Sequence, residues 1–159
     1  MKQKKLPGFT LVEILVVVAL IAILATITIV ALNPAKNFAD TRNAKRSAHV
    51  NTILDAVTQY LSQESNTILT LEAGDTSTPK DAIPSCPATI PIGTTVTAAA
   101  SFDLKPLLVD ATINYVVEIP TDPQGGTQAL TGYTICKTGN RIQIAAPNAE
   151  NGASIVVKR

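Results

Sequence analysis

The sequence lacks the side-chain sets that most enzyme mechanisms need. It contains one histidine, His49, and two cysteines, Cys86 and Cys136, without a CxxC pair or a Cys/His ligand set. No nucleophile motif, no glycine-rich phosphate loop after a strand and no metal-ligand spacing occurs in it. We therefore expect no enzyme activity, no catalytic residue, no metal and no cofactor.

An excess of charge of one sign is also missing. Charged residues make up only 16% of the chain, and 13 basic against 12 acidic side chains leave a net charge of +1. This balance produces no global field that would favour nucleic acid, so DNA is a weakly supported partner. The length of 159 residues is enough for one modest domain with an extension.

Hydrophobic residues, 46% of the chain, are concentrated near the N-terminus. From Phe9 to Leu32 the only charged residue is Glu13. A helix over this range would be about 36 Å long and could cross a hydrocarbon core of roughly 30 Å. A cleaved secretory signal fits poorly, because its apolar core is usually about 7–15 residues and a small-residue cleavage site follows it. A plain membrane anchor fits the length but does not explain Pro7, Gly8 or Glu13.

The stretch KKLPGFTLVEILVVVALIAIL, which begins at Lys4, resembles the class III signal of type IV prepilins and pseudopilins. In that family a basic leader ends in glycine, and a membrane peptidase cuts before the apolar helix and methylates the new amino terminus. The resemblance implies a leader of residues 1–8, cleavage between Gly8 and Phe9, and N-methylation of Phe9. Glycine lets an active site approach the backbone closely, and Pro7 keeps the leader out of the helix.

The resemblance also gives Glu13 a role in subunit assembly. A carboxylate inside a membrane usually needs a partner, because charge is costly in hydrocarbon. The implied partner is the amine of Phe9 on a neighbouring subunit. Such an ion pair would strengthen in low dielectric and set the position of the incoming subunit. An interfacial Glu13 that reaches the lipid headgroups is the alternative.

Taken together, these features imply a structural subunit of a type IV pilus or pilus-like filament. Such a subunit is a single-pass protein of the cytoplasmic membrane before assembly and lies on the cell surface afterwards. The implied partners are the chain itself or other pilins, the prepilin peptidase and methyltransferase, the assembly platform protein with its ATPase machinery, and the membrane. Two alternatives stay open: a minor pilin or competence pseudopilin that binds DNA or a surface, and a pseudopilin of type II secretion.

Residues 9–33 are expected to form the transmembrane and polymerisation helix, and residues 34–64 its amphipathic continuation. Pro34 is expected to break or kink the helix, because proline lacks a backbone donor and clashes with the preceding turn. In the second half, apolar residues recur at three- and four-residue spacing and predict a stripe that lies on a sheet. The stripe consists of Val50, Ile53, Leu54, Val57 and Leu61.

A basic patch precedes that stripe. Arg42, Lys45 and Arg46 lie close together in the sequence, and Lys36 is nearby. We expect these side chains to form a solvated helix face. Contacts with other subunits, with lipid headgroups or with DNA are the alternatives.

Residues 65–159 are expected to form a globular head. The region 71–110 is rich in threonine, alanine and proline, and it predicts a connecting loop with at most short elements. The region 111–159 predicts a β-sheet, with a hairpin turn at Gly139-Asn140. Its strands are expected at residues 112–119, 132–138, 141–146 and 154–159. The expected fold class is α+β, the pilin fold, in which a long N-terminal helix packs on a small C-terminal antiparallel sheet.

The two cysteines favour a single disulfide between Cys86 and Cys136 in a protein that leaves the cytosol. Two buried free thiols are the alternative. Closing a loop of this length would stabilise the fold by ~4 kcal/mol in the chain-entropy model.

The stretch PTDPQGG, residues 120–126, resembles the Asp-Pro-x-Gly turn of major pseudopilins, some of which bind calcium in a nearby loop. Asp122 is the only acid between Ile119 and Glu150. A calcium cage needs more oxygen ligands than this region supplies. The sequence therefore favours a structural turn.

Overall fold

The computed structural model describes residues 8–63, 65–73, 82–94, 101–109 and 114–159. The chain divides into two compact units, Met1–Phe38 and Ala39–Arg159. Most of the expected leader lies outside the described residues. The same is true of position 64, of parts of the expected loop region 71–110, and of the first residues of the strand expected at 112–119.

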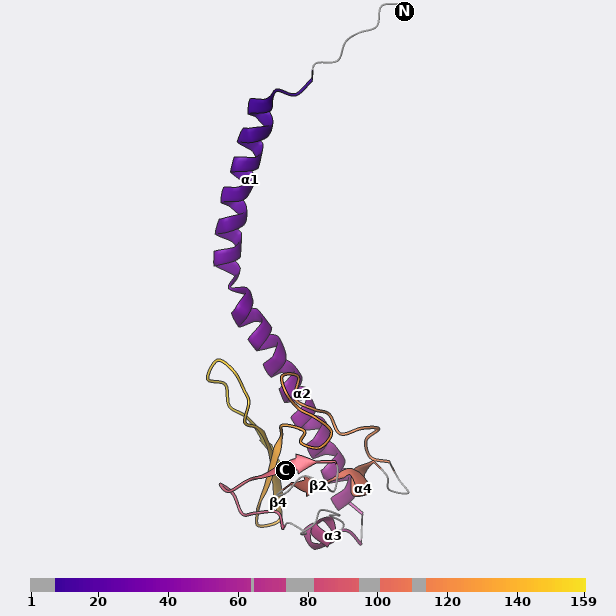
Figure 1. The fold of residues 1–159 in the computed structure, drawn as a ribbon. Helices are drawn as coiled ribbons and strands as arrows, with labels where there is room; N and C mark the ends of the chain where they lie inside the picture. Colours follow the sequence, from indigo (N-terminus) through magenta and orange to yellow (C-terminus); the bar gives the residue numbers. More distant parts are fainter. Residues whose placement is uncertain (1–7, 64, 74–81, 95–100, 110–113) are drawn as a thin grey trace, which may run out of the picture. The chain divides into compact units, whose positions relative to one another are not determined.

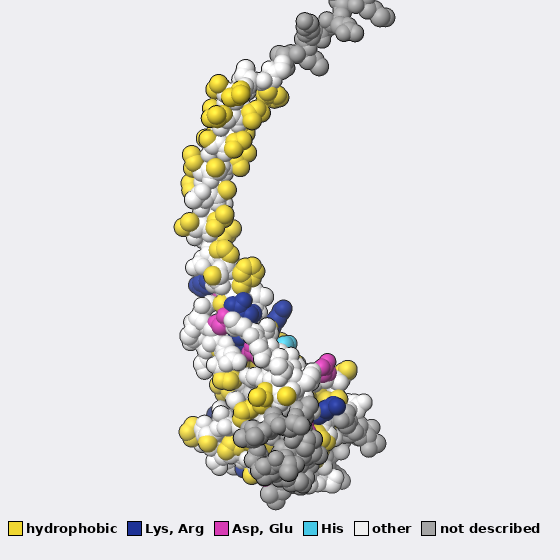
Figure 2. Space-filling model, viewed as in Figure 1, with side chains coloured by type: hydrophobic (Ala, Val, Ile, Leu, Met, Phe, Trp, Pro, Cys, Tyr) yellow, Lys and Arg dark blue, Asp and Glu magenta, His cyan; other side chains and the backbone are white. Residues whose placement is uncertain are grey.

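The first unit is built around α1, Leu11–Leu32. None of its side chains is buried within the chain, and hydrophobic side chains cover the visible face of this helix in Figure 2. Among the described residues, one helix is long and apolar enough to cross a membrane; it starts at Leu11 and contains a window with a mean hydropathy of 3.1. A helix that is apolar on all sides needs lipid or other helices to cover it.

The helix is interrupted at Asn33, in the place where Pro34 was expected to break it. Asn33 adopts the left-handed conformation, with φ 39° and ψ 71°, and α2, Pro34–Leu61, begins with the proline. Proline is tolerated at the first helical position because the N–H that it lacks would have no partner there. The side-chain amide of Asn37 donates to the carbonyl of Leu32 at 2.8 Å, which satisfies an acceptor freed by the interruption.

In the second unit, α2 packs on a five-stranded sheet with the strand order β2-β1-β3-β4-β5. Figure 1 labels α2 and two of these strands, β2 and β4. The apolar stripe of α2 lies on the sheet, as expected. Its residues Val50, Ile53 and Val57 are at most 1% exposed and share one hydrophobic cluster with Ile135 and Ile144. The elements that follow α2 are α3 (Ile68–Ala73), β1 (Ile90–Gly93), β2 (Phe102–Asp103), α4 (Lys105–Leu108), β3 (Thr134–Thr138), β4 (Arg141–Ala146) and β5 (Ile155–Lys158).

Strands β3 and β4 form the hairpin expected around Gly139-Asn140. Gly139 has a φ of 59°, a left-handed conformation that glycine adopts without strain. Alternate residues of β4, Ile142 and Ile144, are buried, as the period of a half-covered strand requires. The last strand, β5, adds antiparallel to β4.

The α+β pilin fold is confirmed, but the sheet is mixed and not purely antiparallel. β2 pairs parallel with β1, with Ile92 opposite Phe102. The other strand pairs are antiparallel. Both β1 and β2 lie in the region 71–110, which was expected to be a connecting loop with at most short elements. The sheet therefore includes two short strands from outside the expected region 111–159.

The density of prolines is what made a strand at β1 look improbable from the sequence. β1 pairs with β3 through Ile90 and Pro91, and with β2 only from Ile92 onward. On the side of β3, the N–H of Ile92 donates to the carbonyl of Tyr133, the residue directly before that strand. The backbone N–H groups of successive strand residues point to opposite sides of the strand. An N–H at position 91 would therefore point away from β3, toward the side of β2. Because β2 pairs only from Ile92 onward, the donor that Pro91 lacks would have no partner strand there.

The strand expected at residues 112–119 is wrong for its described part, residues 114–119. Tyr115 and Val116 donate their backbone N–H groups to the carbonyl of Leu108, and Val117 is 93% exposed. The edge of β3 that a further strand could have used is occupied by β1. The β-branched composition of this stretch therefore does not decide its structure, because another segment pairs there.

Cys86 and Cys136 form a disulfide, the pairing that the sequence favours. It joins the segment before β1 to β3, and the two Cα atoms are 5.3 Å apart. Beside it, the backbone N–H of Cys86 donates to the carbonyl of Lys137 at 2.9 Å, and that of Lys137 donates to Pro84 at 2.9 Å. The segment before β1 is thus fixed to the sheet by both covalent and backbone contacts.

Candidate functional site

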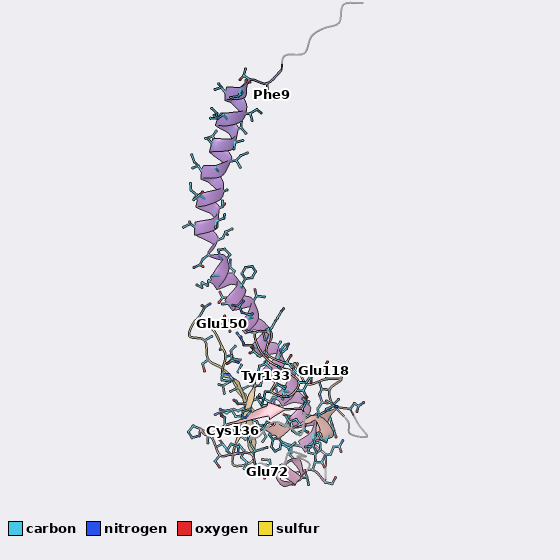
Figure 3. The ribbon with its side chains drawn as sticks, viewed as in Figure 1. Phe9, Glu72, Glu118, Tyr133, Cys136 and Glu150 are labelled. Atoms are coloured by element: carbon cyan, nitrogen blue, oxygen red, sulfur yellow. A yellow bond between two sulfur atoms is a disulfide. The ribbon has the colours of Figure 1, made fainter. Side chains whose placement is uncertain are left out.

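The residues expected to take part in processing lie in a short segment before α1. Gly8, Phe9 and Thr10 precede the helix, and Phe9 is 86% exposed at its end (Figure 3). A Cβ atom placed on Gly8 would meet no atom within 4 Å. The peptide bond between Gly8 and Phe9 is therefore outside the helix and open to an approaching enzyme.

Glu13 is held by the N-cap of α1. The carboxylate oxygen Oε2 of Glu13 accepts hydrogen bonds from the backbone N–H and from the hydroxyl of Thr10, each at 2.8 Å. In return the Thr10 hydroxyl oxygen accepts the backbone N–H of Glu13 at 3.3 Å. This reciprocal pair is a capping box, which satisfies two backbone donors at the start of the helix.

The family resemblance implies an intermolecular partner for Glu13, and the local partner Thr10 was not predicted. The signal that could have found it is a Thr-x-x-Glu spacing directly before an apolar run. A carboxylate in the first helical turn also lies favourably in the helix dipole. Glu13 thus has hydrogen-bond partners within its own chain, which lowers the cost of a charge at the head of an apolar helix.

Residues 5–29 match a known protein family, the prokaryotic N-terminal methylation motif. The match supports a class III signal peptide of the type IV pilin and pseudopilin kind. No curated protein and no solved structure matches the chain. The family match covers the signal and most of α1, and the head lies outside it.

The match supports a signal of the pilin-like or pseudopilin kind in the N-terminal segment. It implies processing by a prepilin peptidase, and the apolar helix implies a membrane-anchored precursor.

The basic patch predicted on α2 is not a solvated face as a whole. Arg46 is fully buried, and its guanidinium pairs with the carboxylate of Asp122, with Nε 2.7 Å from Oδ2. Arg42 makes two hydrogen bonds of 2.6 Å to the carboxylate of Glu150. A further nitrogen of Arg46 is 2.9 Å from the same carboxylate. These four side chains, which we term the head clamp, join α2 to two loops of the head.

The charged groups of the head clamp shift one another's pKa values. Hydrogen bonds from Arg42, and then from Arg46, lower the pKa of Glu150 to about 2. The hydrogen bond to Asp122 raises the pKa of Arg46. Arg42, Arg46 and Glu150 therefore carry their full charges at neutral pH. Of the four cations in the predicted basic patch, Lys36 and Lys45 are the exposed ones.

The turn expected at residues 120–126 is present and has a structural task. Asp122 accepts the backbone N–H of Gln124 on its carboxylate at 2.8 Å, and its carbonyl accepts that of Gly126 at 3.1 Å. A Cβ on Gly126 would lie 2.3 Å from the backbone nitrogen of Asp122, so only glycine fits. Among the residues that the structure describes, no group of three or more His, Cys, Asp or Glu side chains could hold a metal ion.

His49 contacts the buried end of Tyr133. The ring nitrogen Nδ1 of His49 is 2.8 Å from the Tyr133 hydroxyl. Burial raises the pKa of Tyr133 to about 12, and the nearby charge of Asp122 adds to the effect. The single histidine of the chain thus packs against the core beside the head clamp.

Proposed function

We propose that this chain is a structural subunit of a type IV pilus or pilus-like filament. The observation that carries the proposal is the junction at Gly8 and Phe9, which lies directly before a capped helix that is apolar on all sides. Such a helix remains on the product after cleavage, because the cut precedes it. Burial among the helices of neighbouring subunits would then replace lipid as its cover.

Processing proceeds at the exposed junction. The prepilin peptidase cuts between Gly8 and Phe9, which frees the amine of Phe9, and the same enzyme methylates that amine. The product has lost the basic leader and has gained a positive charge four residues before Glu13. The precursor is a single-pass protein of the cytoplasmic membrane.

Assembly uses the new amine. Within one chain the capping box fixes Glu13 at the start of the helix, with one carboxylate oxygen, Oε2, bonded to Thr10. Because Glu13 is exposed, its carboxylate could also accept the Phe9 amine of a neighbouring subunit, and the two opposite charges would define the axial position of that subunit. The platform protein and the ATPase machinery of the pilus supply the work of extraction from the membrane.

Electron microscopy of cells that make Glu13→Ala tests the assembly step. We expect the variant to be cleaved normally and to form far fewer fibres, because the amine of the incoming subunit then lacks its partner. Thr28→Val is the matched control on the same helix, since the Thr28 hydroxyl only donates to the carbonyl of Ala25. Wild-type numbers of fibres in Glu13→Ala would remove the role that we assign to Glu13.

The two alternatives, a DNA-binding or surface-binding minor pilin and a secretion pseudopilin, share the same signal. The pairing of Arg42 and Arg46 with Glu150 and Asp122 takes two of the four cations of the predicted basic patch out of reach of DNA. Deletion of the gene separates the classes: loss of all fibres supports a major subunit, and persisting fibres indicate a minor one.

A further inference from the structure

The loop between β4 and β5 contains a tight turn over residues 150–153. The backbone N–H of Ala153 donates to the carbonyl of Glu150 at 3.1 Å, which closes the turn. The two residues between them, Asn151 and Gly152, both have a positive φ, of 56° and 70°. Asparagine and glycine adopt this conformation more readily than other residues. Because the turn begins at Glu150, which Figure 3 labels, it lies directly beside the head clamp.

The sequence of this turn is chemically labile. Asn151 is the only asparagine of the chain that is followed by glycine. Asparagine is one of the less durable residues, because the backbone nitrogen of the next residue can attack its side-chain amide. Glycine makes this attack easiest, since it has no Cβ atom that blocks the approach to its nitrogen. Both residues are exposed, so water reaches them.

The nitrogen of Gly152 is free to react. Within the part of the chain that the structure describes, its N–H donates to no protein group. A Cβ atom placed on Gly152 would meet no atom within 4 Å, so the space around the residue is open as well. The attacking nitrogen thus has neither a competing hydrogen bond nor a crowded neighbourhood.

The side-chain amide of Asn151, by contrast, is held by α2. Its Nδ2 donates to Oδ1 of Asp40 at 3.0 Å. For the attack, the amide carbon Cγ of Asn151 has to come into near-attack geometry with the nitrogen of Gly152. A side chain that is bonded to another element is restricted in this movement. The contact with Asp40 therefore slows the reaction.

We propose that Asn151 is a site of non-enzymatic deamidation and that its contact with Asp40 controls the rate. The nitrogen of Gly152 forms a bond to Cγ of Asn151, the bond between Cγ and Nδ2 breaks, and ammonia leaves with the proton of the Gly152 N–H. Water then opens the succinimide ring at either carbonyl, which leaves aspartate or isoaspartate at position 151. The net reaction consumes water and releases ammonia. The site does not depend on the proposed filament function.

Deamidation changes the contact between this loop and α2. A carboxylate at position 151 replaces a hydrogen-bond donor with an acceptor and faces the carboxylate of Asp40, and like charges repel. The adjacent N–H of Glu150 donates to the side chain of Asn43, also on α2, at 3.0 Å. The modified loop is therefore held less firmly at the place where Glu150 enters the head clamp.

Peptide mapping of the folded, full-length chain in detergent tests the site. During incubation at mildly alkaline pH, we expect Asn151 to deamidate severalfold faster than Asn140 and Asn148. These two asparagines are the internal controls, because they are also exposed but precede arginine and alanine. Tandem mass spectra that locate the change from amide to acid measure each position. Conversion of Asn151 no faster than that of Asn148 would overturn the proposal.

Substitution of Asp40 tests whether the contact controls the rate. Asp40→Ala removes the acceptor and should raise the rate at Asn151 severalfold. Asp40→Asn keeps a side-chain oxygen that can accept the same hydrogen bond, so its rate should stay near that of the wild type. Asp55→Ala, at an exposed acid further along α2, is the matched control and should also leave the rate unchanged.

Two results would remove the role of Asp40. One is an equal rate at Asn151 in Asp40→Ala and in the wild type. The other is a parallel rise at Asn148 in Asp40→Ala, which would show that the variant unfolds and that the contact itself has no effect on the rate.

The variant Asn151→Asp carries the product from the start and tests the consequence. Hydrogen exchange of the full-length chain should show severalfold faster exchange of the Glu150 N–H than in the wild type. The added change Asp40→Asn should restore the wild-type exchange rate, because only one carboxylate then remains in the contact. Unchanged exchange in Asn151→Asp would contradict the loosening of the loop.

Discussion

At the scale of single residues, three residues at the N-terminal end of α1 have separate roles: Gly8, Thr10 and Glu13. Gly8 leaves the backbone open where we propose that the chain is cut. Thr10 caps the helix with its hydroxyl and its N–H. Glu13 accepts hydrogen bonds from both of these groups at the head of an apolar helix. Each role depends on the absence of a side chain at Gly8 or on the hydrogen bonds of Thr10 and Glu13. One substitution can therefore remove each role.

We expect Gly8→Val to keep its leader. The added side chain meets no atom of the chain within 4 Å, so its effect falls on the close approach of the peptidase to the backbone. Intact-mass measurement should find that the wild type has lost residues 1–8 and gained a methyl group on Phe9, whereas the variant begins at Met1. Gly125→Val, at another glycine with open space, is the control and should be processed normally. A processed Gly8→Val, or a wild type that keeps Met1, would contradict the cleavage site.

The ionisation of Glu150 predicts a dependence of stability on pH. Arg42 and Arg46 lower its pKa from the ordinary value of 4.5 to about 2 in the folded state. The contribution of Glu150 is therefore fully present above about pH 4.5 and is lost as the pH falls toward about 2. Unfolding midpoints measured across this interval should fall less steeply in Glu150→Gln than in the wild type. Glu118→Gln, at an exposed acid, should keep the wild-type slope, and equal slopes for Glu150→Gln would contradict the prediction.

At the scale of elements, the head clamp explains how α2 is attached to loops that follow much later in the sequence. Arg46 reaches the turn at Asp122, and both Arg42 and Arg46 reach Glu150. Asn43 adds to the attachment, because its side chain donates to the carbonyl of Glu150 and accepts its N–H. The polar side of α2 is thus as closely tied to the head as its apolar stripe.

We expect Arg46→Ala to lower the free energy of unfolding by about 3–5 kcal/mol, because it leaves the buried carboxylate of Asp122 without its cation. Lys45→Ala, one residue earlier and exposed, is the matched control and should change it by less than about 0.5 kcal/mol. Denaturant unfolding of the full chain in detergent, followed by circular dichroism, measures both. Equal stabilities of the two variants would show that the ion pair does not hold the turn.

At the scale of the whole molecule, the disulfide closes a long covalent loop within the head. Cys86 and Cys136 are 50 residues apart in the sequence, and the bond between them encloses β1, β2 and α4. Short strands and short helices bury little surface each, so the loop that contains them gains from a constraint on the unfolded chain.

We expect the double variant Cys86→Ser, Cys136→Ser to be less stable than the wild type by ~4 kcal/mol, the value of the chain-entropy model for a loop of this length. Denaturant unfolding with and without reductant measures the difference. Reductant should bring the wild type to the level of the variant and leave the variant unchanged. A wild type that is insensitive to reductant would show that the packed head does not depend on the bond.

Much of the molecule was predictable because its causes are local in the sequence. The apolar run from Phe9, the break at Pro34 and the stripe of α2 each follow from residues within a few positions of one another. The hairpin at Gly139-Asn140 has the same character, since a turn and two alternating strands specify it. The Thr10 to Glu13 cap was equally local, and it was missed only because Glu13 was assigned a distant partner.

The sequence by itself determined the signal, the two long helices α1 and α2 and the hairpin, and tertiary structure decided the rest. Arg46 looked like one member of a solvated patch, and only its burial against Asp122, 76 residues away, made it part of the core. Likewise β1 and not residues 114–119 pairs with β3, because one strand edge can accept only one of two competing segments. Both choices depend on contacts between distant parts of the chain, which periodicity and spacing along the sequence do not contain.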